Sequence, residues 1–416
     1  MKVDNLTSFF PYDSGKLPYL TNELEGTGGK IKKTPEDFKV EEIPLYPAGG
    51  NGTHLYFLLT KKGLTTEEAI KKIASRIDRQ PAEFGFAGHK DARATTVQRV
   101  SIEHVEREQL EELQFEQMKI KPIDYHRNKL RPGHHAGNRF QIKIKDVEPA
   151  AKVKAEKITE QLEKSGVPNY YGPQRFGRRG DSAILGECLL KDKLEEFVNL
   201  YLGHSLKDDP PAVKQARDLF DSGDYESPFD YWPYSQQNRR NCLAAFKNTK
   251  NPKVVVGQVP KRLRRLFVSA FQSQIFNELL AERIESIDQL REGDVAKKHD
   301  TGGRFRVEDV EREQPRANNF EISPTGPIPG GDLFLPTGAP GEIEQRVLKK
   351  FQFEPKLHNR AGTLKVEGTR RFLRFKLEEL ALKPDANSNQ LTIEFAAPPG
   401  SYATALLREV MKVELT

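Results

Sequence analysis

A glycine-flanked acidic loop contains the residues best suited to chemistry. It belongs to the segment GFAGHKDARATTVQRVSI, in which Gly85 and Gly88 precede Lys90 and Asp91. Glycines let the backbone turn sharply and let a substrate approach closely. Lys90 and Arg93 are cations that would keep the Asp91 carboxyl ionised, and an ionised carboxylate can act as a nucleophile or base at a sugar carbon. The alternative is a turn aspartate that hydrogen-bonds its own backbone.

Residues suited to binding metals or cofactors lack the required spacing. Cys188 and Cys242 lie far apart in the sequence, and neither is in a C-x-x-C pair or beside a histidine at metal-ligand spacing. His134 and His135 are adjacent, so in a strand they would face opposite ways, and no carboxylate lies between them. We find no Walker loop and no dinucleotide fingerprint. We therefore expect no metal and no cofactor.

Basic residues are concentrated in two stretches of the chain. Its 416 residues have a formal net charge of +6. Nine Lys or Arg and no Asp or Glu occur between Arg239 and Arg265. A second acid-free stretch from Tyr125 to Lys145 contains Arg127, Lys129, Arg131, Arg139, Lys143 and Lys145. Such stretches favour a polyanionic partner, because each neutralised phosphate releases counterions, although either stretch alone could be a solvated basic face.

The elements that must position the acidic loop are short strands and helices. Residues 53–60, THLYFLLT, are expected to form a strand, and Thr65 with Glu68 forms a capping box that begins a helix ending near Asp78. An amphipathic helix is expected over roughly 149–164. Further short strands are expected at Phe84–Ala87, Thr96–Ile102, Met118–Ile123 and Arg139–Ile144. Their hairpin-length links predict an α+β fold with a mainly antiparallel sheet and helices packed on one face.

The end of the chain indicates a discontinuous first domain. Beyond Gly166 the sequence becomes loop-like, and helical patterns then alternate with a Pro/Gly-rich span. The last residues return to one strand, LTIEFAAP, and one helix, YATALLREVMKV, which together are too little to form a domain. They most economically complete the first sheet. We therefore expect one domain of residues 1–167 plus 384–416, interrupted by a second domain of residues 168–383.

Six motifs in the same order resemble the TruD family of RNA pseudouridine synthases. GHKDARATTVQ is similar to the family segment G-x-K-D-x-x-A-x-T-x-Q. The other five family motifs match the segments Thr34–Phe38, Gly137–Phe140, VPNYYGPQRFG at 167–177, Ala270–Asn277 and Ala397–Glu409. Together they span nearly the whole chain, and their common order is hard to explain by chance.

The resemblance implies a cofactor-independent isomerase that converts a uridine of tRNA, usually at position 13, into pseudouridine. Asp91 takes the place of the catalytic aspartate. Lys32 aligns with a lysine that pairs with this carboxylate, although Lys30 and Lys33 are close enough to be alternatives, and Lys90 fits the K-D pair. The fold implied is a pseudouridine-synthase catalytic domain interrupted by an α/β insertion domain. The extra length between about residues 190 and 268 looks like the archaeal and eukaryotic branch.

The same resemblance implies which residues bind the substrate. Phe140 matches an aromatic on which a flipped base stacks, and Asn138 matches a residue near the base and the catalytic aspartate. By periodicity alone, Phe140 would be ordinary core, because Ile142 and Ile144 lie on the same strand face, and Asn138 could be a turn residue. Substrate binding is also expected of the residues in the longest motif, namely Asn169, Gln174, Arg175 and Phe176.

The partners and location follow from these expectations. We expect a tRNA substrate and no obligatory protein partner. No apolar run is long enough to span a bilayer, and the first residues lack the apolar core of a secretory signal, so we expect a cytoplasmic protein. Two other functions are alternatives. A catalytically silent RNA-binding protein should have lost the Lys90–Asp91 pair, and a metal-dependent nuclease would need converging carboxylates that the spacing does not provide.

Overall fold

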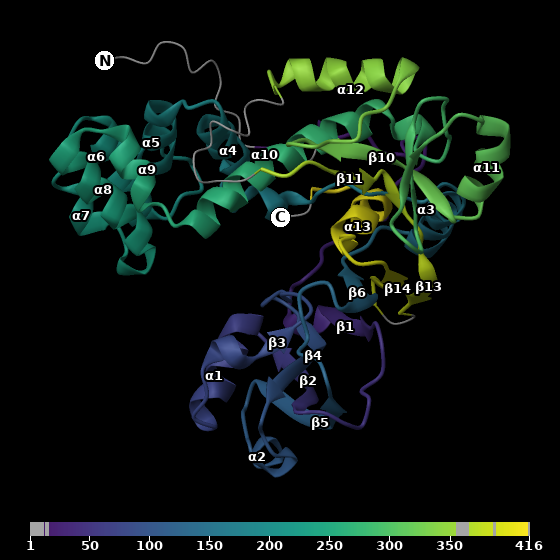
Figure 1. Ribbon diagram of the computed structural model, residues 1–416, viewed down its shortest axis with the longest axis horizontal. Coiled ribbons are helices and arrows are strands. Elements are labelled where there is room, and N and C mark those ends of the chain that lie inside the picture. Colours follow the sequence, from purple (N-terminus) through teal and green to yellow (C-terminus); the bar gives the residue numbers. More distant parts are fainter. Residues whose placement is uncertain (1–11, 13–15, 355–365, 386–387, 415–416) are drawn as a thin grey trace. The chain divides into compact units, whose positions relative to one another are not determined.

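The chain divides into two units of dense internal contacts. The computed structural model describes residues 12, 16–354, 366–385 and 388–414 (Figure 1). We call residues 21–167 and 375–413 the sheet unit. The helical unit comprises residues 168–374 and the described residues of 1–20 and 414–416. The chain thus passes between units at 167–168 and 374–375, and the N-terminal residues group with the helical unit. The domain division expected from the sequence stays a prediction.

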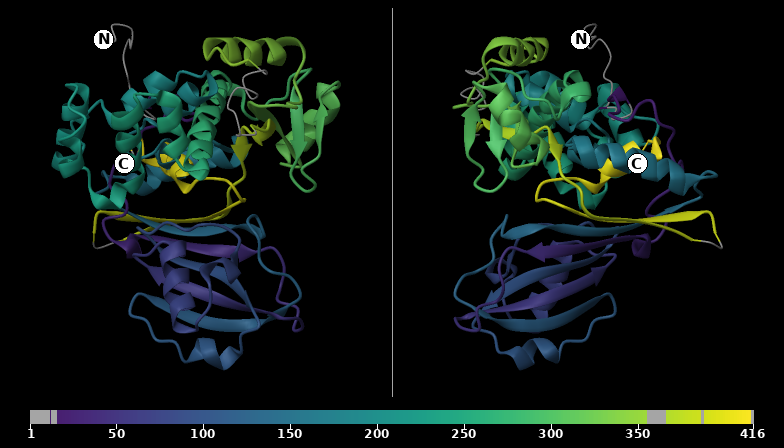
Figure 2. Two further views of the ribbon diagram at one scale, coloured as in Figure 1. Left: turned by 60° about the vertical axis from the view of Figure 1, so that its left-hand side comes forward. Right: turned by 90° about the vertical axis from the view of Figure 1, so that its right-hand side faces the viewer.

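The sheet unit is built on an eight-stranded sheet with the order β13-β14-β6-β1-β4-β2-β5, and β3 pairs with β4. Among the described strand pairs of this sheet, only β1 and β4 are parallel, so the mainly antiparallel sheet of an α+β fold is confirmed (Figure 2). The strands are β1 (Phe38–Pro44), β2 (His54–Lys62), β3 (Gly85–Phe86), β4 (Thr95–Glu103), β5 (Met118–His126), β6 (His135–Lys145), β13 (Glu378–Pro384) and β14 (Gln390–Ala397).

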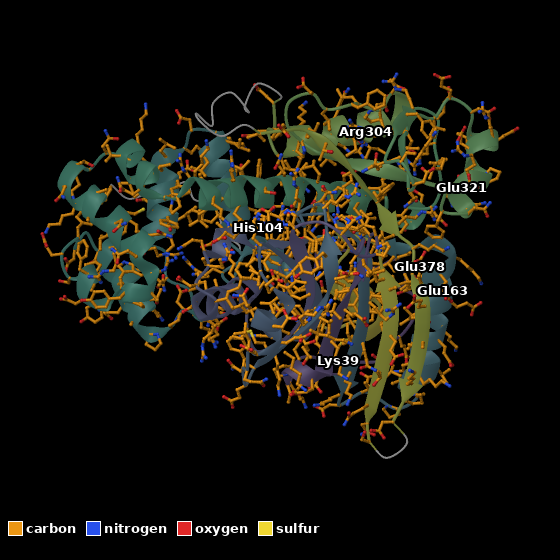
Figure 3. The ribbon with its side chains drawn as sticks, turned by 60° about the horizontal axis from the view of Figure 1, so that its bottom comes forward. Lys39, His104, Glu163, Arg304, Glu321 and Glu378 are labelled. Carbon is orange, nitrogen blue, oxygen red and sulfur yellow. The ribbon has the colours of Figure 1, made fainter. Side chains whose placement is uncertain are left out.

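Alternation along the strands defines an inward face. In β1, Phe38, Val40 and Glu42 are buried, whereas Lys39, labelled in Figure 3, is exposed. β13 was not expected as a strand, because it is a sheet edge in which no residue is fully buried. Such an edge lacks the apolar alternation that reveals a half-buried strand.

Helices cover the inward face of the sheet unit. The capping box predicted at Thr65 and Glu68 begins α1 (Thr66–Arg76). In α1, Ile70 and Ile73 pack in one buried cluster with Phe57 of β2 and Val100 of β4. The remaining helices and 3₁₀ turns are α2 (Arg107–Glu111), α3 (Ala151–Ser165), α13 (Ala403–Met411), η2 (Pro35–Asp37) and η3 (Pro81–Glu83).

The helical unit combines a helix cluster with a small sheet of order β11-β10-β8-β9. Its elements are α4 (Ser182–Leu190), α5 (Leu194–Leu202), α6 (Pro211–Asp221), α7 (Pro228–Tyr231), α8 (Gln237–Thr249), α9 (Pro252–Gln258), α10 (Lys261–Glu282), α11 (Val310–Asn318), α12 (Gly338–Lys350), η4 (Pro173–Phe176), η5 (Tyr234–Gln236), η6 (Ile284–Ser286), β8 (Val295–Lys298), β9 (Arg304–Arg306), β10 (Ile322–Ile328) and β11 (Thr369–Phe372). Two-residue strands β7 (Val167–Pro168) and β12 (Arg374–Phe375) mark the boundaries. Within the described chain, no helix has both the length and the apolar character needed to cross a bilayer.

Candidate active site around Asp91

Asp91 lies in the loop between β3 and β4, and its side chain is 29% exposed. Its Oδ2 accepts a hydrogen bond from the Lys32 ammonium at 2.5 Å. Its Oδ1 accepts a hydrogen bond from the backbone N–H of Arg93 at 2.9 Å. One oxygen thus closes the local turn that the sequence offered as the alternative, and the other pairs with a cation, Lys32. A catalytic role of Asp91 stays a prediction.

Lys32 is the lysine that the structure brings to Asp91. Its side chain is 13% exposed, and its Nζ lies 4.5 Å from the centre of the Phe38 ring. Its backbone is in the left-handed region, with φ of 56°. Lys33 instead pairs with the exposed Asp146, and the Lys30 backbone bridges to Lys145. Neighbouring lysines thus have different partners, and only Lys32 of the three pairs with the Asp91 carboxylate among the described residues.

Lys90 turns away from the carboxylate that follows it in the sequence. Its Nζ donates to Asn138 Oδ1 at 2.8 Å and lies 3.0 Å from Glu42 Oε2. The Lys90 and Glu42 side chains are almost completely buried. Asn138 and Glu42 face each other across β6 and β1, so Lys90 connects the loop that carries Asp91 to two strands of the sheet.

His135 lies beside this buried ion pair. Burial lowers the pKa of His135 below its usual value, Lys90 lowers it further, and Glu42 acts in the opposite direction. Its Nδ1 is buried and has no hydrogen-bond partner among the described residues. The imidazole is therefore neutral near pH 7 and adds no charge to the pair.

Lys61 of β2 is hydrogen-bonded to the backbone of the loop that carries Asp91. Its side chain is completely buried. Its ammonium donates to the carbonyl oxygens of Leu64 at 2.6 Å, Asp91 at 3.2 Å and Lys90 at 3.3 Å. Burial lowers the pKa of Lys61 to about 8, although the Asp91 charge raises it. The amine thus binds the carbonyl groups of two consecutive peptide bonds, Lys90–Asp91 and Asp91–Ala92.

Two further buried polar residues hold the same loop. Thr66 Oγ1 accepts the backbone N–H of Lys90 at 3.0 Å and donates to Gln98 Oε1 at 2.9 Å. Gln98 Nε2 donates to the carbonyl oxygen of Gly88 at 3.3 Å. The loop that carries Asp91 is thus fixed at Gly88, Lys90 and Asp91 by side chains from β2, α1 and β4.

Sequence reasoning missed Lys61, Thr66, Gln98 and the role of Glu42, although a signal was available. Lys61 follows Leu55, Phe57 and Leu59 at every second position of β2, and all four are buried. Glu42 continues the buried alternation of β1 in the same way. A charged residue at an inward-facing strand position needs a partner to offset its desolvation, so it can indicate a site.

Phe140 lies on the inward face of β6, as does Asn138 two residues before it. Its ring is 7% exposed and stacks on Phe395 with centroids 5.0 Å apart. It meets the edge of Phe38 at 6.3 Å, and Phe38 is the ring beneath the Lys32 ammonium. Phe140 therefore belongs to an aromatic cluster that reaches the Asp91 pair. Stacking on a flipped base stays a prediction.

The four other predicted substrate-binding residues belong to the helical unit. Asn169 is buried, donates to the Phe372 carbonyl and accepts from Arg371. Phe176 is 1% exposed and stacks on Tyr12. Gln174 is exposed, and Arg175 donates to Ser273 Oγ at 3.1 Å. The contacts of Asn169 and Phe176 are those of core residues, and substrate binding by all four stays a prediction.

Histidines and carboxylates in the described chain do not form a metal site, since no group of three potential ligands is present there. His134 Nδ1 lies 3.0 Å from the Tyr46 hydroxyl, and His126 Nδ1 lies 3.3 Å from that of Tyr56. These two histidines therefore belong to an aromatic and hydrogen-bonded cluster.

Comparison with known proteins identifies the family. The family model described as tRNA pseudouridine synthase D (TruD) matches residues 15–410. The chain belongs to this family. It is 38% identical over 397 residues to tRNA pseudouridine synthase D of Syntrophotalea carbinolica, covering 95% of this chain and 99% of that protein. It is 40% identical over 402 residues to the Geobacter metallireducens protein, covering 96% and 98%.

A solved TruD structure has the same fold. The crystal structure of the Methanosarcina mazei TruD protein matches with a TM-score of 0.82 at 27% identity and covers 95% of this chain and 96% of that one. The family, the fold class and the enzyme class expected from the sequence, an RNA uridine isomerase, are thereby confirmed. The Syntrophotalea and Geobacter proteins are bacterial and match over nearly their whole length. Chain length therefore does not indicate the archaeal branch, and that part of the expectation was wrong.

Proposed function

We propose that this chain is a tRNA pseudouridine synthase in which Asp91 is the catalytic carboxylate. The observation that carries the proposal is the surrounding of Asp91: a partly exposed carboxylate paired with Lys32 on a loop that three buried side chains fix in place. Fixed geometry matters because catalysis requires the reacting atoms to be held close together and aligned. The family membership supplies the reaction to which this carboxylate is suited.

The reaction changes the atom through which the uracil base is bonded to its ribose. The N1–C1′ bond breaks, the uracil rotates, and C5 bonds to C1′; N1 then carries a proton and C5 loses one. Asp91 either attacks C1′ or removes the proton at C2′, and either route requires an ionised carboxylate. Lys32 supports this state, because an adjacent ammonium favours the charged form of a carboxyl group. No redox or group-transfer cofactor is needed, since atoms and electrons balance within the nucleotide.

Positioning roles follow for the residues around Asp91. Lys61 orients the Lys90–Asp91 peptide bond, and Lys90 joins the loop to Asn138 and Glu42. Asn138 and Phe140 lie on the same strand face and are the residues that we expect to meet the flipped uracil. Phe140 is braced by Phe395, so it would contact the base as a rigid surface.

The substrate class is inferred from the relatives, which are named tRNA pseudouridine synthase D. We propose that this chain modifies a tRNA uridine, at position 13 as the resemblance implies, in the cytoplasm and without an obligatory protein partner. The sheet unit would be the catalytic domain, since it contains Asp91 and the residues that bind its loop. The helical unit would be the insertion domain.

The test incubates the purified protein with an unmodified tRNA transcript and a chelator of divalent cations, and maps pseudouridine by chemical labelling. We expect pseudouridine at one uridine and no dependence on divalent metal. Strand cleavage that stops in the chelator would instead identify a metal-dependent nuclease. Binding of the transcript without any pseudouridine would identify a silent RNA-binding protein.

A further inference from the structure

The basic stretch from Arg239 to Arg265 divides into two parts with different surroundings. Four of the five cations of its first part have partners within the helical unit: Arg239 stacks over Tyr201, Arg240 donates to the carbonyl oxygens of Phe229 and Trp232, Lys247 pairs with Glu226, and Lys250 lies over Tyr225. These contacts within the helical unit are enough to account for the positive charge of four basic residues without a ligand. They give no reason to assign that part to a ligand.

The second part lies at the beginning of α10, the 22-residue helix labelled in Figure 1. Lys261, Arg262 and Arg265 are exposed there. With Arg175 they line an open pocket of about 460 Å³, which Leu266 and Ser269 complete. Four cations thus surround one hollow, and the described residues that line it include no acid.

The helix spacing brings these side chains together. Lys261, Arg265 and Ser269 are four residues apart, so they follow one another along one face of α10. The N-terminus of a helix of this length adds a partial positive charge to the same end. The pocket therefore concentrates positive charge by both side chains and backbone.

Arg175 is held in place on the other side of the pocket. Its Nε donates to Ser273 Oγ at 3.1 Å, and its terminal nitrogen donates to Ser269 Oγ. Its guanidinium lies 5.3 Å from the centre of the Tyr171 ring. Less rotamer freedom is lost when a side chain fixed in this way binds an anion, so its contribution to affinity is larger.

We propose that this pocket, which we call the α10 pocket, binds a backbone phosphate of the tRNA. The assignment rests on the proposed function for the identity of the polyanion, whereas the concentration of cations is a property of the helical unit itself. A phosphate offers several acceptor oxygens to Arg and Lys donors and carries no base identity. The pocket would therefore add affinity to every tRNA without choosing the uridine.

The test measures binding of an unmodified tRNA transcript by full-length protein across a series of salt concentrations. Arg265→Gln and Lys261→Gln remove one charge each from the pocket. Lys247→Gln is the matched control, because it removes one charge from the same basic stretch outside the pocket. We expect each pocket variant to weaken binding by about three- to tenfold. The slope of log Kd against log salt should fall by about one for each variant.

The outcomes separate this proposal from the proposed function. Wild-type affinity and slope in both pocket variants would overturn the α10 pocket, as would an equal loss in Lys247→Gln. If the pocket variants weaken tRNA binding and the Lys247→Gln control does not, the pocket is supported. If the wild-type protein at the same time forms no pseudouridine, the proposed function is contradicted. Adding inorganic phosphate at the salt concentration of the assay should compete only weakly, because a single phosphate lacks the other contacts of the RNA.

Discussion

Two buried cations, Lys61 in the sheet unit and Arg370 in the helical unit, have opposite surroundings. The Arg370 guanidinium forks onto both oxygens of Glu344, at 2.9 and 2.5 Å, and donates to Thr325 as well. The Lys61 ammonium meets three backbone carbonyls, and no carboxylate lies within hydrogen-bonding distance of it in the described part of the chain. Arg370 is therefore paired with a full negative charge, whereas Lys61 is bound only by carbonyl dipoles.

This difference indicates what each residue is for. A bidentate ion pair offsets much of the desolvation of both partners, so it suits a structural position. Lys61 is less well compensated, which is why burial lowers its pKa to about 8. A group that reduces stability is expected where function requires it. In the sheet unit, we propose that this requirement is the orientation of the loop that carries Asp91.

Breaking the structural pair should have the largest effect on stability. Arg370→Met leaves the buried Glu344 without its cation, and we expect the free energy of unfolding to fall by about 3–5 kcal/mol. Urea denaturation measures the change. Replacing Glu344 by Leu in the same chain should recover most of it, because no buried charge is then left alone. A loss below about 1 kcal/mol would contradict the structural role.

The pH dependence of stability should distinguish Lys61 from a paired cation. Below about pH 8, its amine is protonated in both the folded and the unfolded chain. Between about pH 8 and the ordinary lysine value of 10.5, the unfolded chain binds more protons, so the stability contributed by this group rises with pH. Relative to Lys61→Met, the wild type should gain up to about 3 kcal/mol across this window. If the difference in free energy of unfolding between the two proteins stays constant with pH, the idea that the Lys61 charge is buried without compensation is refuted.

Removing the Lys61 amine should also slow the reaction. Lys61→Met leaves the Lys90 and Asp91 carbonyls without their donor, so we expect kcat to fall by about 10–100-fold, with little change in KM for tRNA. Lys62→Met is the matched control, since Lys62 is exposed on the other side of β2 and pairs with Glu36. Equal kinetics for the two variants would show that Lys61 does not position the loop.

The smallest expected effect is at Thr66. Thr66→Val removes the acceptor of the Lys90 N–H but leaves Lys61 in place. Because one of several anchors is lost, we expect kcat to fall by about three- to tenfold. Measuring kcat of the double variant Thr66→Val, Lys61→Met shows whether these two side chains act together on the loop that carries Asp91. Strictly additive losses in free energy of activation would contradict a shared action.

Local patterns predicted much of the fold. Short runs of strand-forming residues predicted β2, β4 and β6, and the Thr65–Glu68 box predicted the beginning of α1, because these signals depend on residues close in sequence. The edge strand β13 was not predicted, since none of its side chains is fully buried.

The candidate site could be predicted only in part. The motif pointed to Asp91, and its resemblance favoured Lys32 over Lys30 and Lys33, but sequence could not show that Lys90 faces Glu42 and Asn138. That direction depends on contacts between strands far apart in the chain. The basic stretch shows the same limit, because only the structure separates cations used in folding from those lining the α10 pocket.

The most direct test of the central claim compares wild-type protein with Asp91→Asn in single-turnover conversion of tRNA, with enzyme in excess. The amide keeps the shape of the side chain and its acceptor for the Arg93 N–H, but it is neither a nucleophile nor a base. We expect tRNA binding to be retained and the rate of pseudouridine formation to fall by more than about 10³-fold. A wild-type rate in Asp91→Asn would show that another group performs the chemistry.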